Sequence, residues 1–231
     1  ESLTPAIFVS ADIVFKEASD SVSLLNGETI KIIRADSTCN DPSAAIAAAE
    51  GVIAQGVTAI LGAVCSEATE TIFLESALTS RVLMISPAST SSSLNDLDDK
   101  GFFRISPSDS RGGQILADIT KDRKIKKVAI TYTDSNYEKS LAYAYKEAAE
   151  KHGIKVTTII SHEKNKDDYS SEVASLVAAE GDAIALISDF DQGGKEIIQA
   201  SIDTGAFNKF ILSDRMMSQS LIDIFGKKLK K

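Results

Sequence analysis

The chain has 231 residues, of which 43% are hydrophobic and 25% are charged, and it carries a formal net charge of −8 at pH 7. This length allows one large α/β domain or two lobes of about a hundred residues each. The acidic balance argues against nucleic-acid binding, which depends on an excess of lysine and arginine. It suits a soluble, monomeric protein that diffuses freely.

No targeting or membrane segment is recognisable in the sequence. The apolar runs are all shorter than the roughly 18 residues that a membrane span needs. No basic and then apolar signal peptide opens the chain, and its start in mid-pattern at Glu1 predicts a processed or trimmed protein.

Hydrophobic periodicity predicts helices and strands in alternation. Residues 7–18 place their apolar side chains on one helical face, and residues 27–36 alternate as a strand does. Asn40 or Asp41 is then expected to cap a helix whose first residue is Pro42. Further helices are expected at 43–55, 66–79, 111–121, 137–151, 169–179, 194–204 and 219–228. Strands are expected at 57–64, 82–88, 128–133, 156–160, 183–188 and 210–213, and within GFFRISPSDS at 101–110.

This alternation is typical of parallel sheets whose two faces are both covered by helices. Right-handed crossovers then bring the carboxyl ends of the strands, and with them any site, to one edge of each sheet. A cap at Asp109 or Ser110 is expected to end the strand of GFFRISPSDS and begin the next helix. Because no Pro/Gly/Ser-rich linker separates the halves, composition leaves one or two domains open.

The stretch from 36 to 90 is the most informative part of the chain. Two apolar strands, VTAILGAV and VLMISPA, each end in a turn rich in serine and threonine, CSEAT and STSSS. Neighbouring parallel strands with such ends gather hydroxyls and backbone N–H groups at one place. This arrangement predicts a site for a small anion, most simply a carboxylate.

Both cysteines lie in this stretch, at the two ends of a predicted strand–helix–strand unit. Cys39 begins the helix and Cys65 ends the following strand, so a disulfide between them is geometrically plausible. In the chain-entropy picture it would stabilise the fold by roughly 3 to 4 kcal/mol. The alternative is a pair of buried free thiols in a cytosolic protein.

The run from CNDPSAA through VTAILGAVCSEAT to VLMISPAST resembles the periplasmic leucine/isoleucine/valine-binding proteins, the type I substrate-binding components of ABC importers. The matching features, in order, are a Cys-x-Asp-Pro turn, an alanine-rich helix, a second cysteine followed by serine, and an Ile-Ser-Pro-Ala-x-Thr turn. The resemblance favours the Cys39–Cys65 disulfide and, with it, an oxidising compartment.

The fold implied by this resemblance is the type I periplasmic-binding-protein fold, with two doubly wound, Rossmann-like α/β lobes. Residues 1–108 would form the N-terminal lobe without its first strand. Residues 109–231 would form the C-terminal lobe, ending before the chain returns to the first one. The chain is therefore expected to be incomplete at both termini.

The function implied is a periplasmic, non-enzymatic receptor. It would bind an amino acid or related small carboxylate in the cleft between the lobes, close around it and deliver it to an ABC permease in the inner membrane. We expect a monomer with no cofactor. Two alternatives remain open: a ligand sensor or regulator of the same fold, and a doubly wound enzyme using Asp134, Asp189 or Asp214.

Three candidate ligand-binding residues follow the two predicted strands of the stretch from 36 to 90. By resemblance, Ser66 and Thr90 would bind the α-carboxylate of the ligand, and the backbone carbonyl of Ala88 would bind its ammonium group. An ordinary helix cap at Ser66 and an ordinary turn after Pro87 are the structural alternatives. The neighbouring serines are expected to lie in a solvated loop: Ser89, Ser91, Ser92 and Ser93.

The other candidates lie in the second half of the chain. Asp214 would bind the ammonium group, because a buried ammonium needs an opposite charge, although this position could instead cap the next helix. Tyr137 and Phe190 would line the cleft, or simply pack in the core. Asp189 and Asp191 flank Phe190 and make this region polar, which argues against leucine as the ligand.

Arg215 could either pair with Asp214 or reach an acidic group of the ligand. For metals the sequence offers little, because neither His152 nor His162 has a partner at metal-ligand spacing. Phosphate-binding loops, dinucleotide fingerprints and nucleophile elbows are also lacking. We therefore expect no metal and no catalysis.

Overall fold

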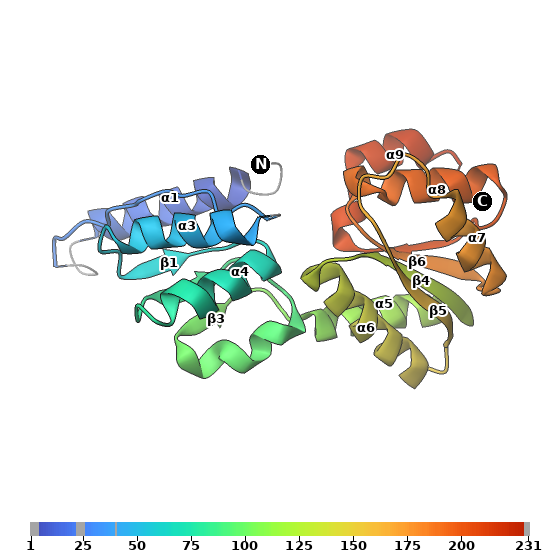
Figure 1. Cartoon of the computed structure of the whole chain (residues 1–231), viewed down its shortest axis with the longest axis horizontal. Coiled ribbons are helices and arrows are strands. Elements are labelled where there is room, and N and C mark those ends of the chain that lie inside the picture. Colours follow the sequence, from blue (N-terminus) through green and yellow to red (C-terminus); the bar gives the residue numbers. More distant parts are fainter. Residues whose placement is uncertain (1–4, 22–25, 40, 229–231) are drawn as a thin grey trace. The chain divides into compact units, whose positions relative to one another are not determined.

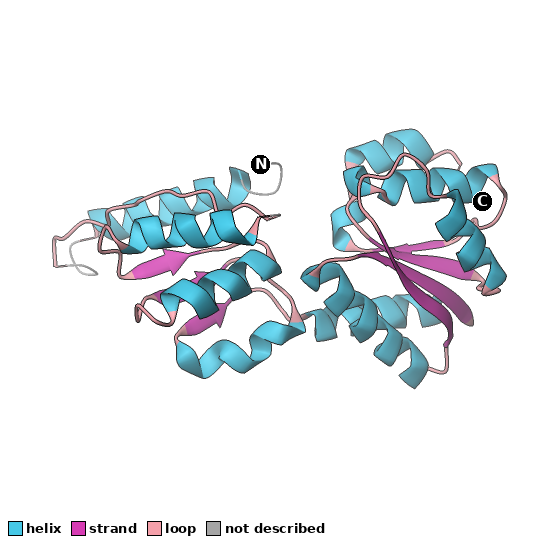
Figure 2. Cartoon of the chain, viewed as in Figure 1, coloured by secondary structure: helices cyan, strands magenta, loops and turns pink. Residues whose placement is uncertain are grey.

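The computed structural model describes residues 5–21, 26–39 and 41–228. They form two compact units, shown in Figures 1 and 2. Unit 1 comprises residues 1–89 and 96–106, and unit 2 comprises residues 90–95 and 107–231. The predicted lobe boundary between residues 108 and 109 stays a prediction. Within the described ranges, no helix is both long and apolar enough to cross a membrane.

Unit 1 is built on a parallel sheet of three short strands in the order β1-β2-β3. Its register pairs Ala59 with Leu83 and Met84 with Phe102. The elements of this part of the chain are α1 (Pro5–Asp20), α3 (Pro42–Ile53), β1 (Ala59–Leu61), α4 (Ser66–Ile72), the π-helix η1 (Phe73–Ala77), β2 (Leu83–Ser86), the 3-10 helix η2 (Ser92–Lys100) and β3 (Phe102–Arg104).

Helix α3 begins as the sequence predicts. The Asp41 side chain accepts a hydrogen bond from the backbone N–H of Ala44 at 3.0 Å, and Pro42 takes the first helical position. Asn40, the other predicted cap, lies outside the described residues. Ala45 and Ala49 are the buried residues of α3, and their small side chains let the helix pack closely on its neighbours.

The prediction of a strand over residues 27–36 is wrong for the structure. Residues 28–38 form neither helix nor strand and belong to no ladder, and Ile32 is 43% exposed. Alternation predicts a strand's conformation, whereas a ladder also requires a hydrogen-bonding neighbour. Together with α1, α3 and β1, this segment lines a hollow of about 670 Å³ inside unit 1.

Unit 2 has a four-stranded parallel sheet in the order β5-β4-β6-β7. Every residue of β6 is buried, as is every residue of β4 after the first, which is the pattern of strands covered on both faces. Its elements are α5 (Asp109–Asp122), β4 (Lys127–Thr133), α6 (Asn136–Lys151), β5 (Lys155–His162), α7 (Ser170–Ala178), β6 (Ala183–Ile187), η3 (Phe190–Gln192), α8 (Gly194–Asp203), β7 (Phe210–Leu212), η4 (Asp214–Met216) and α9 (Gln219–Phe225).

Two hydrophobic clusters flank this sheet. Alternate residues of β4 and β6, such as Ile130 and Ala185, pack against α5 and α6. The intervening residues, such as Ala129 and Ile184, pack against α7, α8 and α9. Figure 1 shows the same division, with α5 and α6 on one side of the strands and α7, α8 and α9 on the other. The predicted parallel sheet with helices on both faces is confirmed for this unit.

Two local predictions need correction. Ser108 caps α5, not Asp109 or Ser110: its side chain accepts from the N–H of Ser110 at 3.3 Å, and Asp109 is already helical. The strand predicted at 156–160 extends to His162, which is therefore a buried sheet residue.

Candidate functional site

The hydroxyl-rich turns that follow β1 and β2 are tied together inside unit 1. The carbonyl oxygen of Ala63 accepts hydrogen bonds from the hydroxyls of Ser86 at 2.6 Å and Thr69 at 3.1 Å. The Ser89 hydroxyl oxygen lies within hydrogen-bond distance of the Thr69 hydroxyl, at 2.7 Å, and of the Val64 carbonyl oxygen, at 3.2 Å. Hydrogen bonds therefore join the turns that predict an anion site into one polar group.

This network corrects one prediction. Ser89 and Ser91 were expected in a solvated loop, but they are only 1% and 2% exposed. Burial is possible because a hydroxyl can satisfy both its donor and its acceptor capacity against nearby backbone groups. Ser92 and Ser93 are less buried than these two.

Each of the three candidates from the stretch 36–90 closely follows a residue of this network in the sequence. Ser66 is the first residue of α4 and is 2% exposed. Ala88 is half-buried, and its N–H donates to the Ser86 hydroxyl at 3.4 Å. Thr90 is half-buried and falls in unit 2, where its carbonyl accepts from the N–H of Asp109 at 2.8 Å. Their roles toward a ligand stay predictions.

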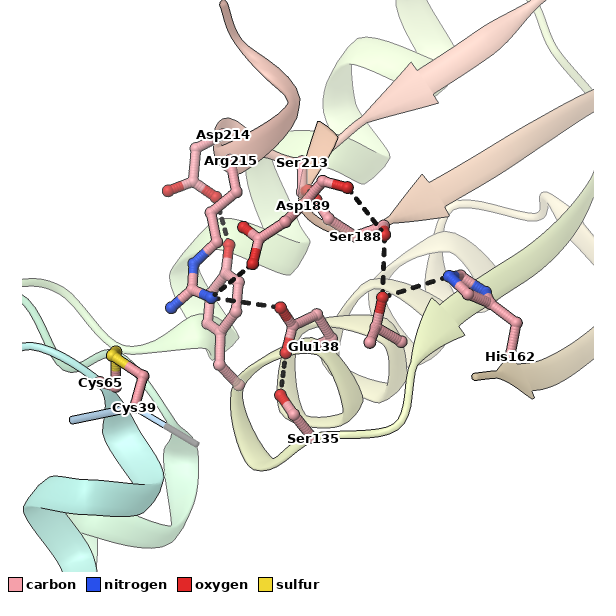
Figure 3. Close-up of polar contacts among 12 residues, drawn as sticks. Cys39, Cys65, Ser135, Glu138, His162, Ser188, Asp189, Ser213, Asp214 and Arg215 are labelled. Carbon is pink, nitrogen blue, oxygen red and sulfur yellow. Dashed lines mark hydrogen bonds and ion pairs between the residues drawn. A yellow bond between two sulfur atoms is a disulfide. The ribbon is translucent and has the colours of Figure 1, made fainter. Parts of the chain in front are cut away.

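A second polar group lies in unit 2 at the carboxyl ends of three adjacent strands. Tyr137 and Glu138 open α6 after β4, Asp189 follows β6, and Asp214 and Arg215 follow β7. Because these strands are parallel neighbours, residues far apart in the sequence meet at one edge of the sheet. Figure 3 shows the side chains of Glu138, Asp189, Asp214 and Arg215 converging there. Together with Tyr137, which contacts Asp214 and Arg215, we call these residues the acidic cluster.

Arg215 lies at the centre of the acidic cluster. One terminal nitrogen, Nη1, is 3.3 Å from a carboxylate oxygen of Glu138 and 3.4 Å from one of Asp189. The guanidinium carbon lies 4.2 Å from the centroid of the Tyr137 ring, in a cation–π contact. Of the two roles predicted for Arg215, the pairing with Asp214 is replaced by pairing with Glu138 and Asp189.

Tyr137 connects Arg215 to Asp214. Its hydroxyl donates a hydrogen bond to a carboxylate oxygen of Asp214, while its ring supports the guanidinium. Burial first, and then the Asp214 charge, raise the pKa of Tyr137, so the hydroxyl remains a donor throughout the physiological pH range. The side chain is 7% exposed, whereas Asp214 itself is exposed. Tyr137 therefore orients an exposed carboxylate by binding one of its two oxygens, and the second oxygen is not used in this hydrogen bond.

Glu138 is the member of the acidic cluster that sequence reasoning missed. Its side chain is only 3% exposed, and it accepts a hydrogen bond from Ser135 besides its ion pair with Arg215. Burial raises the pKa of Glu138 to about 7, although the Arg215 charge opposes that rise. A glutamate in the first turn of a helix is typically an exposed acid that favours the helix dipole, so no local pattern predicts the burial of Glu138.

Phe190 and His162 both lie inside unit 2. Phe190 is 5% exposed and packs edge-on against Phe225, with ring centroids 6.5 Å apart. This position corresponds to the packing alternative, and a ligand contact by Phe190 stays a prediction.

His162 bonds to the hydroxyls of Thr131 and Thr133, which the sequence did not predict. Across the described part of the chain, no group of three or more His, Cys, Asp or Glu side chains could hold a metal ion.

The Cys39–Cys65 disulfide is present, with the two Cα atoms 5.6 Å apart. It connects the segment just before α3 to the residue just before α4, and so links the starts of two helices of unit 1. The predicted pairing is confirmed.

Comparison with known proteins gives a consistent result. The profile of the family described as receptor family ligand binding region matches residues 10–229. An amino acid binding protein of Pseudomonas aeruginosa is 25% identical over 207 residues, covering 87% of this chain and 54% of that protein. The Leu/Ile/Val/Thr-binding protein of Salmonella typhimurium is 26% identical over 206 residues, covering 87% and 55%. This chain thus spans about half the length of these relatives.

Solved structures show the same fold. A leucine binding protein from Thermotoga maritima superposes with a TM-score of 0.77 at 22% identity, over 92% of this chain and 60% of that one. A solute binding protein of an ABC transporter from R. palustris, solved with 4-hydroxybenzoate, gives 0.76 at 18% identity, over 88% and 56%. These likenesses confirm the predicted α/β fold class, that of type I periplasmic binding proteins.

Proposed function

This chain belongs to the family described as "receptor family ligand binding region", and we propose that the protein is the substrate-binding component of an ABC importer. It binds an amino acid or a related small carboxylate and delivers it to a membrane permease. The names of the relatives support this proposal, since they are binding proteins for amino acids and solutes. The relatives are not named as enzymes, and in this proposal the protein carries out no chemical step.

The observation that carries the proposal is the exposed carboxylate of Asp214. A ligand ammonium removed from water requires a negative partner, and Asp214 offers one that is already oriented by the Tyr137 hydroxyl. Orientation before binding lowers the entropy lost when the ligand is held. The ligand carboxylate is assigned to Ser66 and Thr90, with the Ala88 carbonyl as a second acceptor for the ammonium.

The proposed compartment is the periplasm. The Cys39–Cys65 disulfide supports an oxidising environment, because such bonds persist there and are rare where thiols are kept reduced. Protection of unit 1 by a covalent link also suits a receptor that works outside the reach of cytosolic chaperones.

The first test measures thermal unfolding of the protein with a panel of amino acids, their amides and other small carboxylates. A ligand present at a hundredfold excess over its dissociation constant should stabilise the protein by roughly 2.7 kcal/mol, seen as a higher midpoint. If no member of the panel raises the midpoint, the proposed receptor function is wrong. A response with measurable turnover of the ligand would favour an enzyme instead.

The second test addresses Asp214 directly. In Asp214→Asn the carboxylate is lost but the shape is kept, so affinity for an α-amino acid should fall by roughly thirtyfold or more, the usual cost of unpairing a buried charge. Affinity for the des-amino analogue, measured by titration calorimetry, should change little. Asp191→Asn removes the same charge from a nearby exposed residue and serves as the control. Equal losses for both ligands would remove Asp214 from the site.

A further inference from the structure

The acidic cluster has a charge and hydrogen-bonding pattern that restricts the side chain of a ligand. It contains three carboxylates, those of Glu138, Asp189 and Asp214, and one cation, Arg215. Asp214 is assigned to the ligand ammonium in the function proposed above, on which this inference rests. Arg215 and Asp189, which are both partly exposed, are then available to the rest of the ligand, whereas Glu138 is buried.

These groups lie within reach of a ligand held at Asp214. Arg215 is the next residue in the chain, and both side chains contact Tyr137, one through its hydroxyl and the other through its ring. The Arg215 side chain keeps 19% of its surface exposed, and that of Asp189 keeps 23%. Figure 3 shows the second terminal nitrogen of Arg215 directed away from both carboxylates. The cluster therefore presents an N–H donor edge beside a carboxylate acceptor.

Each simple class of charged or apolar side chain meets an obstacle here. A cationic side chain would be attracted by the net negative charge, but it would compete with the guanidinium of Arg215 for carboxylates that Arg215 already pairs. An acidic one would face Asp189, which already pairs with the same guanidinium, and would add to the negative charge of the cluster. An apolar side chain would strip water from N–H groups without replacing their hydrogen bonds, which is costly.

A carboxamide meets none of these obstacles. It is neutral, its carbonyl oxygen accepts hydrogen bonds, and its amino group donates two. The oxygen matches the outward edge of Arg215 and the amino group matches the free acceptor capacity of the Asp189 carboxylate. Burial also raises the pKa of Glu138 to about 7, so the acidic cluster carries less negative charge at neutral pH than its three carboxylates would suggest.

We propose that the ligand is an α-amino acid whose side chain ends in a carboxamide, and that Arg215 is the residue that selects it. Glu138 is a positioning residue: buried and bonded to Ser135, it fixes the guanidinium against the Tyr137 ring without contacting the ligand. Asp189 combines both tasks, because it pairs with Arg215 and remains partly exposed.

The test compares near-isosteric ligands by titration calorimetry with the protein. Glutamine is measured against glutamate, methionine and lysine, and asparagine against aspartate and leucine. At least one amide should bind about tenfold or more tightly than both its acidic and its apolar counterparts, because an unmatched buried polar group discriminates strongly. Binding of leucine or methionine, or of the acids, at equal or higher affinity would overturn the proposal.

Variants at Arg215 then locate the selectivity. Arg215→Met should reduce the preference for the amide over its apolar counterpart to within about twofold, while Arg111→Met, at an exposed arginine at the start of α5, should leave it unchanged. If Arg215→Met fails to fold by circular dichroism, Arg215→Lys keeps the charge and loses the planar donor edge, and it should also reduce the preference. Undiminished selectivity in the folded variants would overturn the role of Arg215.

These results separate this inference from the proposed function. If no amino acid binds at all, the proposed receptor function is wrong, and the proposed preference for a carboxamide side chain is wrong with it. If apolar amino acids bind and Asp214→Asn weakens them, the receptor function stands and only the carboxamide assignment is wrong.

Discussion

At the scale of single residues, His162 is the clearest case of a titratable group that the fold holds uncharged. It lies at the end of β5 with 3% of its surface exposed, and Thr131 bonds to one ring nitrogen at 2.7 Å. Thr133 lies 3.2 Å from the other ring nitrogen and bonds in turn to Ser188 at 2.8 Å. This chain of hydroxyls connects β5, β4 and the residue before Asp189.

The protonation of His162 predicts an acid-sensitive fold. Burial lowers the pKa of His162 from 6.5 to about 4, although the Glu172 charge opposes the change. The unfolded chain therefore binds more protons than the native one between these values, so stability falls as the pH drops from 6.5 toward 4. The loss should approach roughly 3 kcal/mol. Urea unfolding of the wild type and of His162→Gln at pH 4, 5, 6.5 and 7.5 measures it.

Glu138 has the opposite sign and must be separated from His162. Its pKa is raised from 4.5 to about 7, so the stability that it contributes is present below 4.5 and is lost as the pH rises through 7. The difference between wild type and His162→Gln cancels this contribution, since both contain Glu138. Stability profiles that run parallel from pH 4 to 6.5 would contradict the prediction for His162.

The candidate site shows what sequence can and cannot supply at this scale. Tyr137 and Asp214 could be placed at strand ends from apolar runs and turns alone, since parallel strands share an edge. The pairing of Arg215 with Glu138 rather than Asp214 could not, because it depends on which strands are neighbours and how deep a helix start is buried. Buried polar partners depend on packing that no local pattern records.

At the scale of elements, the packing of α5 on α6 rests on one small residue. A Cβ atom added to Gly113 would lie 2.5 Å from backbone atoms of Ala144 and Tyr145, a distance that real contacts do not allow. The two helices approach this closely only because Gly113 has no side chain. We therefore expect α5 to be displaced, and the core it covers to loosen, if any side chain is placed there.

Gly113→Ala should destabilise unit 2 by about 1 to 3 kcal/mol, the usual cost of overpacking. Gly51→Ala is the matched control, because Gly51 also lies within a helix but has nothing within 4 Å of an added Cβ. There the better helix propensity of alanine should stabilise by about 0.5 to 1 kcal/mol. Thermal unfolding of both variants checks the signs, and equal effects would contradict the close-packing argument.

The success of sequence prediction for elements depends on how local their causes are. Strands β4 and β6 were predicted to within one residue at each end, because they are continuous apolar runs buried on both faces. The segment 27–36 was predicted as a strand from its alternating pattern alone, but no strand pairs with it among the described residues, so that prediction is wrong. A helix cap such as Asp41 is local, and it was predicted correctly.

At the scale of the whole molecule, the two units have separate cores and different means of stabilisation. The sheet of unit 1 has three strands of three or four residues, and this unit also contains the disulfide. The sheet of unit 2 is larger, with strands of up to eight residues and two hydrophobic clusters. The family resemblance predicted two lobes, whereas composition alone could not, because no distinctive linker separates them.

This difference predicts that reduction acts on unit 1 alone. Opening the Cys39–Cys65 bond, which closes a loop with a sequence separation of 26, should destabilise unit 1 by roughly 3 to 4 kcal/mol. The sequence provides a selective probe, because all five tyrosines lie between residues 132 and 169 and tryptophan is absent. Tyrosine fluorescence therefore reports on unit 2, whereas far-UV circular dichroism reports on both units.

In urea, reduction or the Cys39→Ser/Cys65→Ser double variant should move an early part of the dichroism transition to lower denaturant concentration. The fluorescence transition should keep its midpoint, because unit 2 holds its own core. If both transitions instead shifted together and stayed coincident, the units would unfold as one cooperative body and their energetic independence would be refuted. Independent units are what a receptor requires if its two halves are to move as rigid bodies around a ligand, so this measurement also bears on the proposed function.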